Sequence, residues 1–84
     1  MIESSELDWI VQKTAELLVD KVSDGPLTDR DISMAFEMFA KPRLDNLGPS
    51  FESDLERMQA RDLIMMKLND RAKQLNSEQW KKTE

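Results

Sequence analysis

The chain contains no cysteine and no histidine. Without cysteine there are no disulfides and no thiolate metal ligands, and without histidine the commonest metal ligand and the commonest general base are also missing. The remaining carboxylates and serines are scattered or occupy positions typical of helix caps. We therefore predict a protein that is not an enzyme and that uses no metal and no cofactor.

Long hydrophobic runs are missing as well. No apolar stretch approaches the length of about 18 residues that a membrane span requires. The first residues carry acids, at Glu3 and Glu6, where a secretion signal needs a basic region. These two observations predict a cytoplasmic protein with no membrane contact.

The charge of the chain is acidic and unevenly spread. Its 17 acids and 12 bases give a net charge of −5, with ten acids and five bases in residues 1–50 and seven of each in residues 51–84. An acidic surface repels nucleic acids and favours basic partners, although it also serves solubility. The pattern argues against nucleic-acid binding. A nucleic-acid-associated accessory protein, or a mimic of DNA charge, is the alternative.

The spacing of the apolar residues is helical in every long segment, and no segment shows the sustained alternation of a half-buried strand. A chain of 84 residues has room for one modest core. We therefore predict a single all-α domain over residues 1–84, a small three-helix bundle with a long C-terminal helix. The expected helices span residues 6–23, 28–41 and 51–76, and a short fourth helix over residues 77–82 is left open.

The second expected helix has the clearest boundary signals. Thr28 is expected to cap it, with Asp31 in the matching capping-box position and with Leu27 and Ile32 spaced as a hydrophobic staple. Pro42 is expected to end it, because the residue before a proline disfavours the α conformation.

Residues 42–50 are expected to form the one substantial loop, in which Leu44 and Leu47 interrupt a polar stretch. The two leucines either tuck under the loop or belong to a recognition loop that is stiffened by a proline at each end. Both are therefore candidates for partner binding.

The three expected helices differ in length. At 1.5 Å per residue they span about 27, 20 and 35–38 Å, so the two shorter helices are not expected to cover the third from end to end. The last turns would then leave an apolar strip in water, which usually marks a contact site. The alternative is a long helix that breaks near residue 69 or residue 76 and folds back. The candidate partner-binding residues on this strip are Ile64, Leu68, Ala72, Leu75 and Trp80.

The lack of catalytic groups and the apolar strip together predict a non-catalytic protein-protein interaction module. Such a module would be an accessory subunit, an adaptor, or a small regulator or inhibitor of a larger protein, acting through a protein partner or through self-association. Five of the six methionines fall on the expected helices, where they either fill the core or form a groove that accepts a partner's helix.

A degenerate EF-hand-like calcium protein is a remote alternative. Asp20, Asp24 and Asp31 fall at positions 1, 5 and 12 of the twelve-residue calcium loop. Position 3, however, is Val22, which has no ligand oxygen. A helix end followed by a helix cap explains the same residues.

Overall fold

The computed structural model describes residues 4–80, with the side chains of residues 4–79. Within this range the chain is helical and contains no strand. The helical segments are α1 (Ser4–Val22), α2 (Asp29–Ala35), the π-helix η1 (Phe36–Ala40), α3 (Lys41–Asn46), the 3₁₀-helix η2 (Gly48–Ser50) and α4 (Asp54–Trp80). The predicted all-α bundle with a long C-terminal helix is confirmed.

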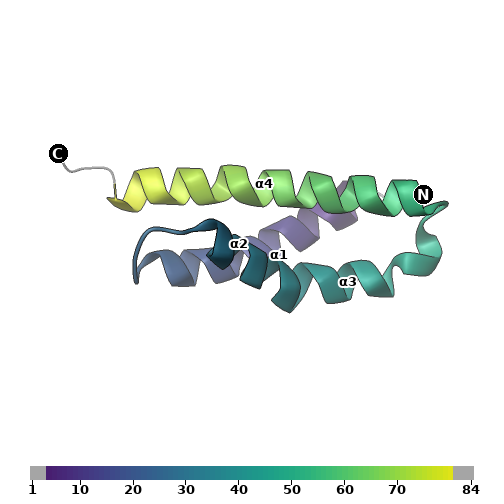
Figure 1. The fold of residues 1–84 in the computed structure, drawn as a ribbon, viewed down its shortest axis with the longest axis horizontal. Helices are drawn as coiled ribbons and strands as arrows, with labels where there is room; N and C mark the ends of the chain where they lie inside the picture. The colour runs from purple at the N-terminus through teal and green to yellow at the C-terminus, as the bar shows by residue number, and fades with distance from the viewer. Residues whose placement is uncertain (1–3, 81–84) are drawn as a thin grey trace.

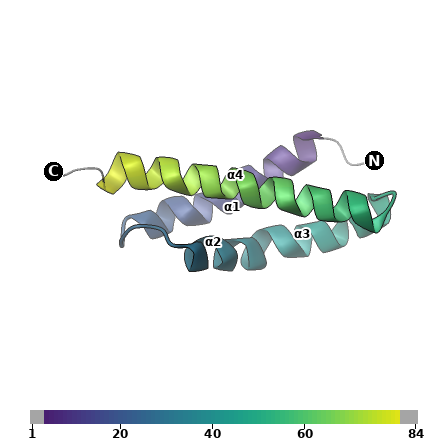
Figure 2. The ribbon, with the colours of Figure 1, turned by 45° about the horizontal axis from the view of Figure 1, so that its top comes forward.

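Three rods make up the bundle, because α2, η1 and α3 follow one another without a break and form a single α2–α3 rod. This rod runs in the opposite direction to α1 and α4 (Figures 1 and 2). The molecule measures 49 × 18 × 17 Å. At 1.5 Å per residue α4 alone spans about 40 Å, so it determines the length of the fold.

The two shorter rods are staggered along α4. The α2–α3 rod extends to the N-terminal end of α4, whereas α1 and the connection over residues 23–28 reach its C-terminal end (Figure 1). Because the shorter rods are displaced relative to each other, together they cover a helix that neither could cover alone.

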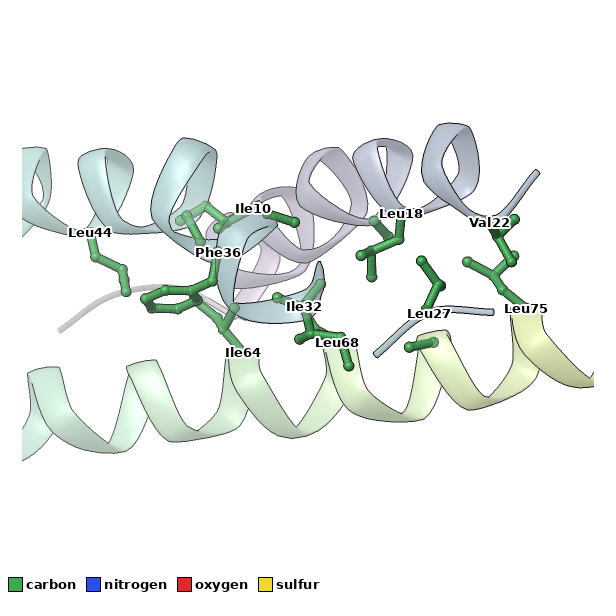
Figure 3. Close-up of a cluster of buried hydrophobic side chains, with 14 of the residues drawn as sticks. Ile10, Leu18, Val22, Leu27, Ile32, Phe36, Leu44, Ile64, Leu68 and Leu75 are labelled. Carbon is green, nitrogen blue, oxygen red and sulfur yellow. The ribbon is translucent and has the colours of Figure 1, made fainter. Parts of the chain in front are cut away.

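The core runs along α4 from Ala60 to Leu75 (Figure 3). Thr14 is its buried polar residue, and its hydroxyl donates a hydrogen bond of 2.7 Å to the carbonyl of Ile10. No buried side-chain polar atom among the described residues is left without a partner. The labelled core side chains in Figure 3 are Ile10, Leu18, Val22, Leu27, Ile32, Phe36, Leu44, Ile64, Leu68 and Leu75.

The start of the α2–α3 rod is as predicted. The backbone N–H of Thr28 donates to the Asp31 carboxylate at 2.9 Å, and the N–H of Asp31 donates to the Thr28 hydroxyl at 3.3 Å. This is the reciprocal pair of a capping box. Leu27 and Ile32 are both buried against the core beside it.

The prediction that the second helix ends before Pro42 is wrong. In a regular α-helix the ring of Pro42 would clash with the carbonyl four residues earlier. Here the backbone widens instead, and the N–H of Lys41 donates to the carbonyl of Phe36, five residues back. The π turn accommodates the proline in the first turn of α3, and the helix continues to Asn46.

The same π turn keeps the buried side chains of the rod on one side. Ile32, Phe36, Ala40 and Leu44 are all buried and are spaced four residues apart. In an α-helix each four-residue step rotates about 40° beyond a full turn, so this stripe would wind away from the core. The wider turn rotates less per residue and brings the second half of the stripe back into register.

Three other boundaries differ from the sequence-based expectation. Residues 42–50 are not a loop, because α3 and η2 occupy most of them. The long helix begins at Asp54 and runs without a break past residues 69 and 76, so it neither folds back nor gives way to a separate helix at residue 77. Residues 81 and 82 of that expected helix lie outside the described range. The first helix begins at Ser4, two residues early.

Candidate functional site

The predicted apolar strip on α4 is not on the surface. The exposed fractions of Ile64, Leu68, Ala72 and Leu75 are 0%, 0%, 2% and 7%. The expectation that these residues are exposed is wrong, because the staggered rods and the 23–28 connection shelter this side of α4 as far as Leu75. The side chain of Trp80 lies outside the described part of the chain.

A hydrogen-bonded clamp closes the end of α4. The side-chain amide of Asn76 accepts a hydrogen bond from the N–H of Leu27 at 2.7 Å and donates one to its carbonyl at 3.0 Å. The clamp brings the connection between α1 and α2 over the helix end, where Leu27, Val22 and Leu75 lie together (Figure 3). The apolar stripe is therefore buried as far as Leu75.

The two remaining candidate partner-binding residues, Leu44 and Leu47, differ in burial. Leu44 is buried, with 4% of its surface exposed. It therefore packs inward, as the first of the two interpretations of this segment predicted. Leu47 is half-buried and lines a hollow between α1 and α3.

Exposed apolar side chains lie elsewhere on the protein. We compared the three grooves between the rods to find where such side chains form a surface. The α1/α4 groove is lined by charged, polar and apolar side chains and is crossed by an ion pair of 3.0 Å between Lys67 and Asp8. The α3/α4 groove is largely charged and is crossed by an ion pair of 2.8 Å between Arg57 and Asp45. Neither groove offers a continuous apolar surface.

The third groove, between α1 and the α2–α3 rod, is mainly apolar. Met38, Met34 and Trp9 are 68%, 49% and 41% exposed, and Leu17 and Phe39 are half-buried beside them. We call these five residues the methionine seam. One hollow of about 340 Å³ lies near Trp9, and another of about 90 Å³ lies between Leu17, Met34 and Met38. No described residue of α4 lines either hollow.

An arginine closes one end of the methionine seam. The guanidinium carbon of Arg43 lies 5.0 Å from the centre of the Trp9 ring and 5.3 Å from that of Phe39. The two rings are 5.6 Å apart and tilted by 54°. Arg43 thus sits over both rings, in the geometry of a cation–π contact.

Large apolar groups are also exposed on α4, and Val19, which is 44% exposed, lines the α1/α4 groove. On α4, Leu55 and Met66 have exposed fractions of 64% and 53%, while Met58, which is 60% exposed, lines the α3/α4 groove. They are separated along the helix by the exposed polar residues Gln59 and Asp62. Singly exposed apolar residues are normal on protein surfaces, whereas contiguous patches mark contact sites.

The sequence offered partial signals for the methionine seam. Met34 and Met38 were open to the groove interpretation, but Arg43 was assigned to a loop. Trp9 and Leu17 are eight residues apart and so lie on one side of α1. Phe39 lies in the π-helix η1 and Arg43 in the following α3, and the sequence pattern does not show this π turn.

Among the described residues, no group of three or more acidic side chains is placed where it could hold a metal ion. Asp31, the expected last ligand, is engaged in the capping box. None of the helices in residues 4–80 is long and apolar enough to cross a membrane. Comparison of the chain with family models, curated proteins and solved structures finds no match.

Proposed function

We propose that the chain is a non-catalytic protein-interaction module that binds its partner along the methionine seam. The observation that carries the proposal is the exposure of Trp9, Met34 and Met38 at two hollows between α1 and the α2–α3 rod, neither of which is lined by a described residue of α4. The buried stripe of α4, which first suggested an interaction module, no longer supports it.

The chemistry of the seam suits a protein surface. Methionine side chains are unbranched and polarisable, so they adapt their shape to a partner, and they recur at binding surfaces that accept helices. Trp9 adds a large, rigid anchor of the kind that dominates binding energy at interfaces. The two grooves beside α4 lack this combination, because ion pairs cross them.

Affinity capture with paired variants tests the proposal. The bait carries Met34→Lys and Met38→Lys together, which places two charges in the seam while changing only exposed positions. The matched control carries Met58→Lys and Met66→Lys on α4, outside the methionine seam, where the exposed fractions are similar. Each bait is first shown by circular dichroism to keep the wild-type helix content.

The expected result is a protein, or a second copy of the chain, that wild type and the α4 control retain and the seam variant does not. Equal retention by all three baits would place the interaction elsewhere. If no bait retains anything at physiological concentration, the proposal is wrong.

A further inference from the structure

We infer that the partner of the methionine seam is a second copy of the chain, bound seam to seam about a two-fold axis that crosses the helices. Glu6 of each copy then lies beside Lys21 of the other, and Arg43 of each lies beside Asp31 of the other. The inference rests on the proposed function and names its partner.

Each end of the seam carries one acid and one base, on opposite helices. The larger hollow is lined by Glu6 from α1 and Arg43 from α3. At the smaller hollow the order is reversed, because Lys21 lies on α1 and Asp31 on α2. No other charged residue in the described part of the chain lines either hollow.

These four charges are available to a second molecule. None of them forms an ion pair with another described residue. Glu6, Lys21 and Arg43 are exposed, and Asp31 is half-buried. The Thr28 N–H and hydroxyl donate to one and the same carboxylate oxygen of Asp31, so the other oxygen can accept from a partner.

The order of the charges is self-complementary. A two-fold axis across the helices exchanges the ends of the seam and sets α1 against α1 and the α2–α3 rod against itself, so every charge faces its opposite. At 1.5 Å per residue the two charges are about 22 Å apart on α1 and about 18 Å apart on the rod. Because each end pair shares a hollow, the midpoints of these separations lie level and one axis serves both.

The apolar residues between the charges fit the same axis. Met38, which is 68% exposed, lies near the midpoint of the rod and so meets Met38 of the second copy. Met34 lines the smaller hollow, and the exchange of ends brings it to the Trp9 side of the second copy, where the larger hollow of about 340 Å³ lies. Methionine fills irregular gaps and makes favourable contacts with aromatic rings.

Two other arrangements fit less well. A two-fold axis along the seam would also pair opposite charges, Glu6 with Arg43 and Lys21 with Asp31, but it would set the two larger hollows against each other and leave them unfilled. An unrelated protein would have to carry four charges in the same reversed order, which a second copy supplies by symmetry.

The grooves beside α4 offer no comparable surface. Ion pairs cross both, and the exposed large apolar residue among the described residues that line each groove is Val19 or Met58. Arg61 lies 5.7 Å from the centre of the Phe36 ring in the α3/α4 groove, so an arginine over a ring does not by itself distinguish the seam. The seam differs in having its exposed apolar residues between two reversed charge pairs.

The size of the surface sets the expected strength. Stable complexes use about 20–30 residues a side, whereas the seam and its four end charges amount to far fewer. We therefore expect a reversible dimer whose population depends on protein concentration.

Sedimentation equilibrium at protein concentrations from about 1 μM to about 1 mM tests the inference. Wild type and the Met58→Lys/Met66→Lys control should form dimers with similar dissociation constants. The Met34→Lys/Met38→Lys variant should dimerise at least about tenfold more weakly, because it places like charges in the contact.

Charge reversal tests the pairing. Glu6→Lys sets lysine opposite lysine and Lys21→Glu sets glutamate opposite glutamate, each at both symmetric contacts, so either variant should dimerise about tenfold more weakly than wild type. A mixture of the two restores opposite charges at both contacts and should form a heterodimer as strong as the wild-type dimer.

The matched controls are Asp62→Lys and Lys73→Glu, at exposed positions of α4 that line none of the hollows described. They change the net charge by the same amounts and should dimerise like wild type, alone or mixed. Circular dichroism first confirms that every variant keeps the wild-type helix content.

The outcomes separate the two proposals. A strict monomer up to about 1 mM overturns the inference, and the proposed function still holds if capture then retains another protein through the seam. A dimer that the Met34→Lys/Met38→Lys variant preserves overturns the inference as well. So does a mixture of Glu6→Lys and Lys21→Glu that dimerises no better than either variant alone.

Discussion

Asn76 and Leu27 are joined by two hydrogen bonds although they lie 49 residues apart in the sequence. The Asn76 amide occupies both polar groups of the Leu27 backbone, at 2.7 Å for the N–H and 3.0 Å for the carbonyl. This contact fixes the α1–α2 connection to the last turns of α4, and it explains why Leu75 is buried.

Replacing Asn76 by Ala should therefore destabilise the fold. Two partly buried backbone groups would lose their partners, at a cost of about 1–3 kcal/mol in the free energy of unfolding. Asn76→Asp, which keeps an acceptor for the Leu27 N–H but has no donor for its carbonyl, should fall between. Urea unfolding followed by circular dichroism gives the values.

The control for this prediction is Ser77→Ala, at an exposed position on the same helix. Its free energy of unfolding should stay within about 0.5 kcal/mol of wild type. Equal effects of Asn76→Ala and Ser77→Ala would show that the clamp contributes nothing in solution.

The π turn gives a second prediction. Deleting Met38 removes one residue from the five of η1 and would convert it to a regular α turn. The ring of Pro42 would then meet the carbonyl of the preceding turn, which costs about 3 kcal/mol in a helix interior. The deletion should therefore be much less harmful when it is combined with Pro42→Ala.

Chemical unfolding of the two deletion variants measures that difference, with Pro42→Ala alone as the reference. If both deletions destabilise the protein equally, the π turn does not owe its presence to Pro42.

The capping box makes stability depend on pH. The pKa of Asp31 is lowered from its ordinary value of 3.8, chiefly by the hydrogen bond from the Thr28 N–H and further by the Thr28 hydroxyl, Lys21 and Arg30. A carboxyl group whose pKa is lower in the folded state stabilises the fold above its unfolded pKa. This stabilisation is lost as pH falls through the folded pKa. Asp31→Asn should therefore be less stable than wild type at neutral pH, and the difference should shrink in strong acid.

Urea midpoints at several pH values test this, with Asp62→Asn as a matched loss of one exposed carboxylate outside the cap. A difference between wild type and Asp31→Asn that persists unchanged in strong acid would show that the charge of the Asp31 carboxylate does not stabilise the fold.

Local signals predicted much of the fold. The capping box at Thr28 and Asp31 and the helical spacing of the apolar residues depend on interactions within a few residues, so the sequence pattern contains them. The sequence pattern did not predict that the helix continues through Pro42. The helix continues because of the π turn, which gives the proline ring room and keeps Leu44 in register with the other buried side chains.

The candidate site was less predictable, because it depends on how the rods are displaced relative to one another. Helix lengths alone suggested that Leu68 and Leu75 would be uncovered. An estimate from helix lengths takes the rods to be aligned at their ends. It also leaves out the α1–α2 connection, which Asn76 holds against α4. Met34 and Met38 are exposed beside a hollow that no described residue of α4 lines, and no spacing rule distinguishes them from core positions.

The most direct test of this account compares Leu68→Ala with Met38→Ala by urea unfolding and light scattering. Leu68 has no exposed surface, so truncation should cost about 2–5 kcal/mol in the free energy of unfolding. Met38 is 68% exposed, and its truncation should change the stability by no more than about 0.5 kcal/mol. If Leu68→Ala instead remains as stable as wild type and only dissociates an oligomer, then the apolar stripe of α4 is an interface between molecules and the account is wrong.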